Sequence, residues 1–110
     1  MSGGTVGNNT AEGNGGGVYV ESANSNTSPT GTFIMNGGII RNNTAEGRGG
    51  GVYLEGWVTW LAGIFTVANE TVKAGISGNS TASGNATDGQ QVYRGNRAVF
   101  TVGGAAADSF

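Results

Sequence analysis

One stretch of this chain is written twice, and that repeat constrains the fold more than any other feature. GGTVGNNTAEGNGGGVYVE at residues 3–21 returns as GGIIRNNTAEGRGGGVYLE at residues 37–55, with fourteen of the nineteen positions identical. A more divergent copy, AGISGNSTASGNATDGQQVYR, follows at residues 74–94. Repeats of roughly 20 to 50 residues made of short apolar pieces are typical of solenoids, in which each repeat packs on its neighbours.

A second set of matching pieces lies between and after these copies. TFIM, IFTV and VFTV occupy residues 32–35, 64–67 and 99–102. Each repeat therefore holds three short segments in fixed order: a V-x-x-N segment, a VY segment and an F-x-hydrophobic segment. We expect a single domain with repeats at about 3–36, 37–73 and 74–104 and a short C-terminal tail at 105–110.

Apolar residues alternate along these segments with a period of two. No segment keeps apolar residues at helical spacing, and glycine, 23 of the 110 residues, disfavours a helix by about 1 kcal/mol per site. A period of two predicts strands with one inward face. The inward set is Val18, Val20, Phe33, Met35, Ile40, Val52, Leu54, Phe65, Val67 and Ile76. The outward set is Tyr19, Tyr53, Ile34 and Thr66.

These patterns predict an all-β fold, a right-handed parallel β-helix of about three rungs with three strands per rung. Rungs would lie about 4.8 Å apart, so equivalent residues would stack. Asn9, Asn43 and Asn79 fall at a corner, where asparagine tolerates left-handed backbone and stacked amides can hydrogen-bond between rungs. Glycines 15–17 and 49–51 precede the VY strand, where a narrow bend would leave little room for Cβ atoms or require a positive φ.

Two other interpretations fit less well. Low-complexity disorder does not require the inward columns to agree in register across three copies. An antiparallel sandwich does not require identical segments at this spacing.

The motifs resemble a known family of repeats. Gly16-Gly17-Val18-Tyr19 and Gly50-Gly51-Val52-Tyr53 are similar to the GGA-[IL]-[FY] motif of polymorphic outer-membrane protein autotransporter passengers. The segments 6–9, 40–43 and 76–79 are similar to that family's F-x-x-N motif, with an aliphatic residue in place of phenylalanine. The resemblance covers nearly the whole chain and is to bacterial surface β-helices. It implies an extracellular, surface-associated or adhesive role, although the family's alanine is glycine here and no β-barrel translocator is present.

The composition argues against several classes of function. The formal net charge is −2 with no Lys/Arg cluster, so we expect no nucleic-acid partner. Cysteine and histidine are absent, which removes thiol nucleophiles, the usual zinc ligands and the commonest general base. No apolar run is long enough to span a membrane. We expect no cofactor, no metal and no enzymatic activity, and stacked glutamates such as Glu21 and Glu55 are interpreted as solvated surface.

Aromatic residues supply the candidate contact surface. Trp57 and Trp60 lie in an insertion after the second VY segment, and they could pack against a subunit or stack on sugar rings. Tyr19, Tyr53 and Tyr93 should form an outward column, which is either a contact surface or simply good strand composition.

Six N-x-[ST] sequons are present, and three of them fall in loops or insertions. These three, Asn26, Asn69 and Asn85, are the candidate N-glycosylation sites, whereas Asn79 is a predicted corner residue.

The ends of the coil carry the functional hypothesis. Only Met1 and Ser2 precede the first repeat, and GGAAADSF after the last strand looks too short for a substantial cap. Arg94 replaces an inward apolar residue and could blunt the last rung or reach a neighbouring copy. Exposed strand edges recruit other chains. We therefore expect an extracellular or cell-surface structural protein whose copies stack head to tail into filaments. The alternatives are an adhesive or polysaccharide-binding module of a larger surface protein and a fragment of a carbohydrate-active β-helix enzyme.

Overall fold

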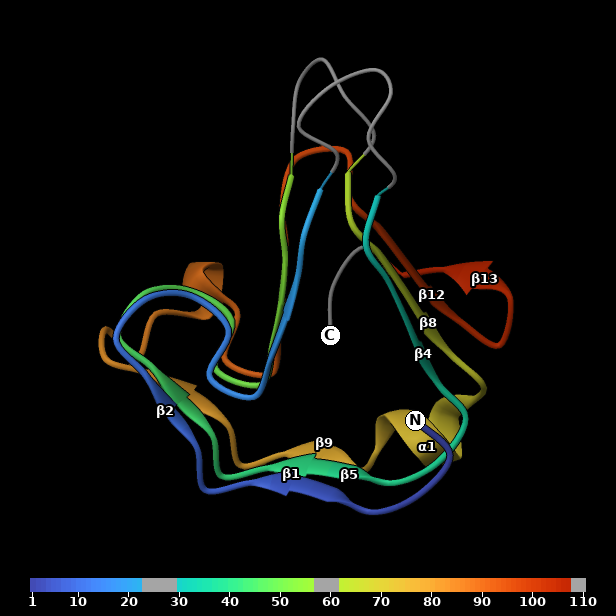
Figure 1. Ribbon diagram of the computed structural model, residues 1–110, viewed down its shortest axis with the longest axis horizontal. Coiled ribbons are helices and arrows are strands. Elements are labelled where there is room, and N and C mark those ends of the chain that lie inside the picture. Colours follow the sequence, from blue (N-terminus) through green and yellow to red (C-terminus); the bar gives the residue numbers. More distant parts are fainter. Residues whose placement is uncertain (23–29, 57–61, 108–110) are drawn as a thin grey trace.

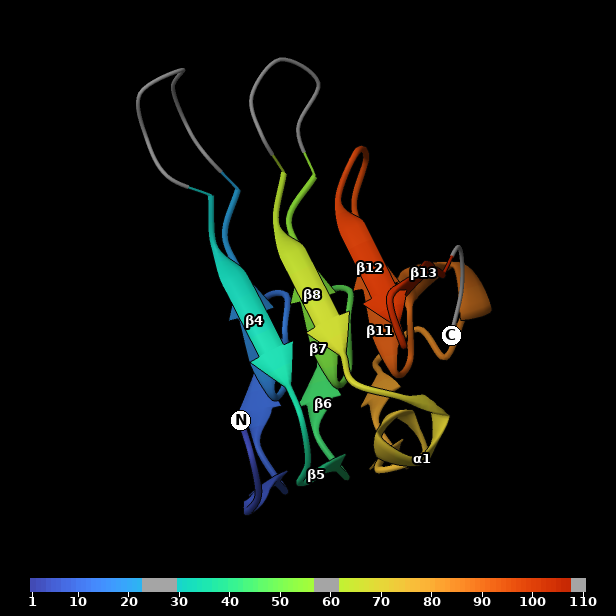
Figure 2. The ribbon, with the colours of Figure 1, turned by 90° about the vertical axis from the view of Figure 1, so that its right-hand side faces the viewer.

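The chain forms a coil of short strands. The computed structural model describes residues 1–22, 30–56 and 62–107, and the structural statements below concern these residues. Figure 1 looks along the coil, and Figure 2 shows its three rungs side by side. With the first rung nearest the viewer, the chain runs clockwise as it recedes, so the coil is right-handed.

Each rung contains four strands. The first rung consists of β1 (Thr5–Gly7), β2 (Thr10–Ala11), β3 (Val18–Val20) and β4 (Thr32–Met35). The second consists of β5 (Ile39–Arg41), β6 (Thr44–Ala45), β7 (Val52–Leu54) and β8 (Ile64–Val67). The third consists of β9 (Ile76–Ser77), β10 (Ser80–Thr81), β11 (Val92–Arg94) and β12 (Val99–Val102).

Three further elements lie outside the repeat. They are a short helix α1 (Glu70–Lys73), a 3-10 turn η1 (Ala86–Asp88) and a two-residue strand β13 (Ala105–Ala106). Figure 2 shows all three at the third-rung end of the coil.

Equivalent strands pair in parallel, as expected for a β-helix. The sheets have the orders β1-β5-β9, β10-β6-β2, β11-β7-β3 and β13-β12-β8-β4. The register aligns Phe33 with Phe65 and Phe65 with Phe100. The predicted parallel β-helix of about three rungs is confirmed. Instead of three strands per rung there are four, because the two-residue strands β2, β6 and β10 form a separate sheet at the corner.

The inward columns form the core. Eight of the ten residues expected inside are buried, and Met35, Ile40, Val52, Leu54, Phe65 and Val67 are fully inaccessible. Val18 and Phe33, both in the first rung, are only half-buried. Ile34 and Tyr19 face outward as expected, with exposed fractions of 49% and 46%. The core is therefore closed in the middle and partly open at the first rung.

The apolar core of the third rung and the edge of β12 are covered, which corrects the expectation that the tail is too short to cap this end. After a turn at Gly103–Gly104, β13 pairs antiparallel with the outer edge of β12. Ala107 donates to the Phe100 carbonyl at 2.8 Å and packs against the core, as does Val72 of α1. Phe100 and Ile76 are consequently only 2% and 1% exposed, although they belong to the last rung.

The glycines before the VY strand serve two separate needs. Gly15 and Gly49 have φ values of 75° and 72°, which side chains rarely adopt. Gly16, Gly17 and the equivalent pair of the second rung do not have positive φ, but a Cβ on any of them would come within 3.0 Å of backbone in the following rung. The repeated triplet thus combines one conformational requirement with two steric ones.

Candidate functional site

The three corner asparagines lie in one continuous ladder. The Asn9 backbone N–H and side-chain Nδ2 both donate to Asn43 Oδ1 at 3.0 Å. Asn43 makes the same pair of bonds to Asn79 Oδ1, also at 3.0 Å. Asn43 is fully buried and Asn79 is 4% exposed, so these bonds satisfy polar groups inside the coil.

The residues that form the ladder are not the residues that make the bend. Asparagine was expected to supply both functions at once, but the left-handed residues are Asn8 and Asn42, with φ values of 59° and 57°, each just before the ladder residue. In the third rung Gly78 takes this role with a φ of 66°. The repeated Asn-Asn pair therefore divides the work between a turn residue and a stacking residue.

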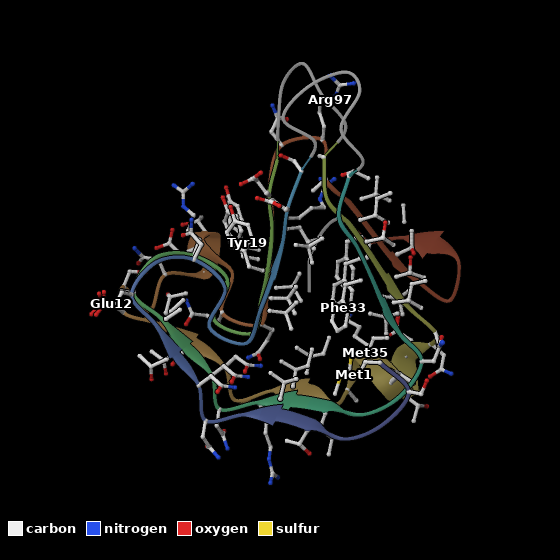
Figure 3. The ribbon with its side chains drawn as sticks, viewed as in Figure 1. Met1, Glu12, Tyr19, Phe33, Met35 and Arg97 are labelled. Carbon is white, nitrogen blue, oxygen red and sulfur yellow. The ribbon has the colours of Figure 1, made fainter. Side chains whose placement is uncertain are left out.

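The outward residues Tyr19, Tyr53 and Tyr93 form a strip of stacked rings. Figure 3 shows Tyr19 on the outside of β3. Tyr19 and Tyr53 have ring centroids 5.0 Å apart, and Tyr53 and Tyr93 have centroids 5.2 Å apart at an interplanar angle of 6°. These distances are within the range of favourable aromatic pairs. The rings of Tyr53 and Tyr93 are nearly parallel, whereas the ring of Tyr19, at the first-rung end of the stack, is inclined by 29° to that of Tyr53.

Charged groups hold the two ends of this tyrosine strip. The Arg48 guanidinium lies 5.2 Å from the Tyr93 ring centroid, donates to its hydroxyl at 3.1 Å and contacts Asp88 at 3.4 Å. At the other end, Glu55 accepts hydrogen bonds from the Tyr19 hydroxyl and from the hydroxyl and backbone N–H of Ser22. Glu55 was interpreted from the sequence as solvated surface, and the structure instead makes it a link between two rungs.

The environment shifts the acidity of these groups. Burial, the hydrogen bond to Glu55 and its charge all raise the pKa of the Tyr19 hydroxyl above its ordinary value. Burial and the neighbouring Tyr93 raise the pKa of Tyr53. For Glu55, burial favours a higher pKa, but the bonds from Ser22 and Tyr19 outweigh burial and leave the pKa below its ordinary value. The cluster is therefore a neutral phenol held by a carboxylate.

Arg94 makes a hydrogen bond within its own rung. It aligns with Leu54 in the sheet, yet its side chain is exposed and its Nη1 donates to the Ala98 carbonyl at 3.0 Å. It thereby closes the bend between β11 and β12.

The predicted glycosylation sites differ in accessibility of the amide. Asn69 is exposed but caps α1, with its side-chain oxygen accepting from the Val72 N–H at 2.9 Å. Asn85 is exposed at the start of η1, and its side chain makes no capping bond. Asn26, Trp57 and Trp60 lie outside the described residues.

Within residues 1–22, 30–56 and 62–107, no group of three or more acidic, cysteine or histidine side chains is placed to hold a metal ion. None of the helices seen there has the length and apolar character to cross a membrane. In comparisons with protein-family models, curated proteins and solved structures, nothing matches this chain significantly.

Proposed function

We propose that the protein is an extracellular structural protein, a β-solenoid unit that lengthens a coil by end-on stacking of rungs. The observation that carries this proposal is the contrast between its two ends. Equivalent residues become buried from one rung to the next: Phe33 is half-buried, whereas Phe65 and Phe100 are 0% and 2% exposed. Among the described residues, the first rung thus leaves apolar surface exposed and one side of β1–β4 without a paired strand.

Unpaired strand edges beside an apolar face favour the addition of further strands. Met1 already shows how the addition would run. It takes the place before Met35 that Met35 takes before Val67 in the next rung. The Met1 carbonyl accepts from the Asn36 N–H at 2.8 Å, just as the Met35 carbonyl accepts from the Ala68 N–H at 3.0 Å. The similarity to surface-protein repeats supports an extracellular or cell-surface location for such a coil, and antibody labelling of intact cells tests that location.

Head-to-tail filaments of this chain alone meet an obstacle. β13 occupies the edge of β12 on which β4 of a second copy would pair. Such filaments require β13 to leave, so we propose a unit that adds to a stack through its first rung.

A four-rung variant tests the proposal. Because Met1 occupies the place equivalent to Met35, a second copy of residues 1–34 placed before Met1 would continue the coil in register. We expect the variant to unfold cooperatively at a higher temperature than the parent. The matched control carries the same duplication shifted by two residues, and equal or lower stability of the in-register variant would contradict rung stacking.

A second candidate function, an adhesive or glycan-binding module, is favoured by the exposed tyrosine strip. Rings in such a strip can stack on sugars. Retention of the protein on polysaccharide columns tests this function, with Tyr19→Leu and Trp57→Ala/Trp60→Ala as the variants. Ile34→Ala, outside the strip, is the control. No retention of the parent protein removes the adhesive function.

A further inference from the structure

The asparagine ladder has a direction. In every step the residue nearer the first rung donates and the residue nearer the third rung accepts: Asn9 donates to Asn43, and Asn43 donates to Asn79. A ladder of this kind ends in free donors at the third rung and a free acceptor at the first. The two ends of the coil therefore need different partners.

Two glutamines satisfy the donor end. Gln91 Oε1 accepts from the Asn79 backbone N–H at 3.2 Å and from its Nδ2 at 2.9 Å. Gln90 Oε1 accepts from the Thr81 N–H at 2.9 Å, and its Nε2 donates to Thr81 Oγ1 at 2.7 Å. These side chains make the bonds that a fourth rung would otherwise make.

The same two positions are glycine in the other rungs. Since Val18, Val52 and Val92 are aligned, Gln91 is equivalent to Gly51 and Gln90 to Gly50. A Cβ on Gly50 or Gly51 would lie within 3.0 Å of the third-rung backbone. Side chains at these positions are compatible only with a rung that has nothing stacked beyond it. The change from Gly-Gly to Gln-Gln therefore marks the last rung in the sequence itself.

The acceptor end is open. Asn9 is exposed. In the described parts of the chain its N–H and Nδ2 donate to Asn43, and its Oδ1 accepts no side-chain hydrogen bond. Around it the inward residues Val6, Val18 and Phe33 are half-buried. A two-fold pairing of two first rungs would bring two acceptor ends together, so neither Asn9 Oδ1 would gain a donor from the ladder of the other copy.

We propose that the first rung is a receptor for the donor face of another rung of this repeat type, and that Gln90 and Gln91 with β13 prevent the chain's own third rung from being that donor. The inference rests on the proposed stacking function and adds its direction and its partner. The partner is a rung with glycine at the two glutamine positions and a corner asparagine whose N–H and Nδ2 reach Asn9 Oδ1. The protein then acts as a terminator, which docks on an open stack and stops its growth.

An opened variant supplies the missing donor face. It carries Gln90→Gly and Gln91→Gly, lacks residues 103–110, and carries Val72→Ala to remove the α1 side chain that packs against the core. We expect the opened variant to form end-to-end polymers, seen as a rise of the weight-average sedimentation coefficient with concentration and as filaments in electron micrographs. The unaltered protein should stay monomeric at the same concentrations.

Mixing the two proteins tests the terminator role. One part of unaltered protein to ten of opened variant should shorten the filaments several-fold, because each unaltered molecule docks by its first rung and presents a closed end. Val18→Asp in the unaltered protein should abolish this shortening, whereas Ile34→Asp, on the outer face, should not. Filaments of the unaltered protein alone, or shortening that survives Val18→Asp, would overturn the inference while leaving rung stacking intact.

A second variant covers the case in which the opened variant does not unfold cooperatively. The four-rung chain places an added corner asparagine above Asn9, and replacing that added residue by alanine removes the donor alone. We expect the side-chain amide hydrogens of the original Asn9 to exchange more slowly with solvent, as followed by NMR, in the asparagine form than in the alanine form. The asparagine form should also have the higher melting temperature. Equal melting temperatures of the two forms would overturn the donor–acceptor direction, whereas failure of both forms to exceed the parent would overturn the stacking function itself.

Discussion

Gly51 stacks directly on Gln91, so closely that a Cβ on the glycine would lie within 3.0 Å of the glutamine's carbonyl oxygen. The same Cβ would also meet the Asn79 side chain at 2.8 Å. We therefore expect Gly51→Ala to destabilise the protein by about 1–3 kcal/mol, as over-packing does elsewhere. The control is Gly13→Ala, where a Cβ would meet nothing within 4 Å. Urea unfolding followed by circular dichroism measures both, and an equal effect at the two sites would contradict the steric explanation.

The phenylalanine column should show the difference between the middle and the open end. Phe65 is inaccessible between Phe33 and Phe100, with ring centroids 5.1 and 5.2 Å away. Replacing it by alanine should cost about 3–5 kcal/mol of unfolding free energy. Phe33→Ala should cost clearly less, because Phe33 is only half-buried. Chemical denaturation of both variants checks the order, and a larger loss at Phe33 would be inconsistent with an open first rung.

The corner ladder predicts a similar order among asparagines. Asn43→Ala removes the acceptor of both Asn9 bonds and the donor to the Val6 carbonyl at 3.0 Å. Each buried group left without a partner costs about 1–3 kcal/mol. Asn9→Ala removes bonds at an exposed end and should cost less. Thermal unfolding of the two variants is the measurement, and the prediction fails if Asn9→Ala is the more damaging change.

Acid should weaken the link between the first two rungs. The folded-state pKa of Glu55 is lowered, so its carboxylate stabilises the fold above the ordinary carboxyl pKa of about 4.3, and the effect is lost as pH falls through the lower folded-state value. We expect a loss of stability between about pH 5 and pH 2, partly due to Glu55. Glu55→Gln should show a smaller loss over this range in urea titrations. An unchanged pH dependence would show that the Tyr19–Glu55–Ser22 contacts carry no net stability.

The stacked columns were predictable because the repeat itself encodes them. Val6, Ile40 and Ile76 each precede an asparagine by the same interval, and a period of two leaves only one inward face. The alignment of the repeat copies with one another therefore predicted the register of the paired strands. The two residues of Thr10–Ala11 carry no period, so the fourth strand of each rung could not be recognised from alternation.

The closed end was missed for a different physical reason. The roles of Gln90 and Gln91 depend on the absence of a rung beyond them, which is a property of the assembled coil and not of the local sequence. The replacement of glycine by glutamine was nevertheless visible in the alignment of the repeats. Likewise β13 follows a turn at Gly103 and Gly104, whose φ values of 61° and 83° bring the chain back on β12.

The unequal ends also give the molecule a direction of unravelling. Local unfolding draws on regions with few buried contacts, and these lie in the first rung around Val18 and Phe33. Amide hydrogens of β7 and β8 should then exchange most slowly, and those of β1 most rapidly. A coil that frays only from its N-terminal side would hold its last rung as an anchor while the first rung opens and closes, ready to capture an incoming strand.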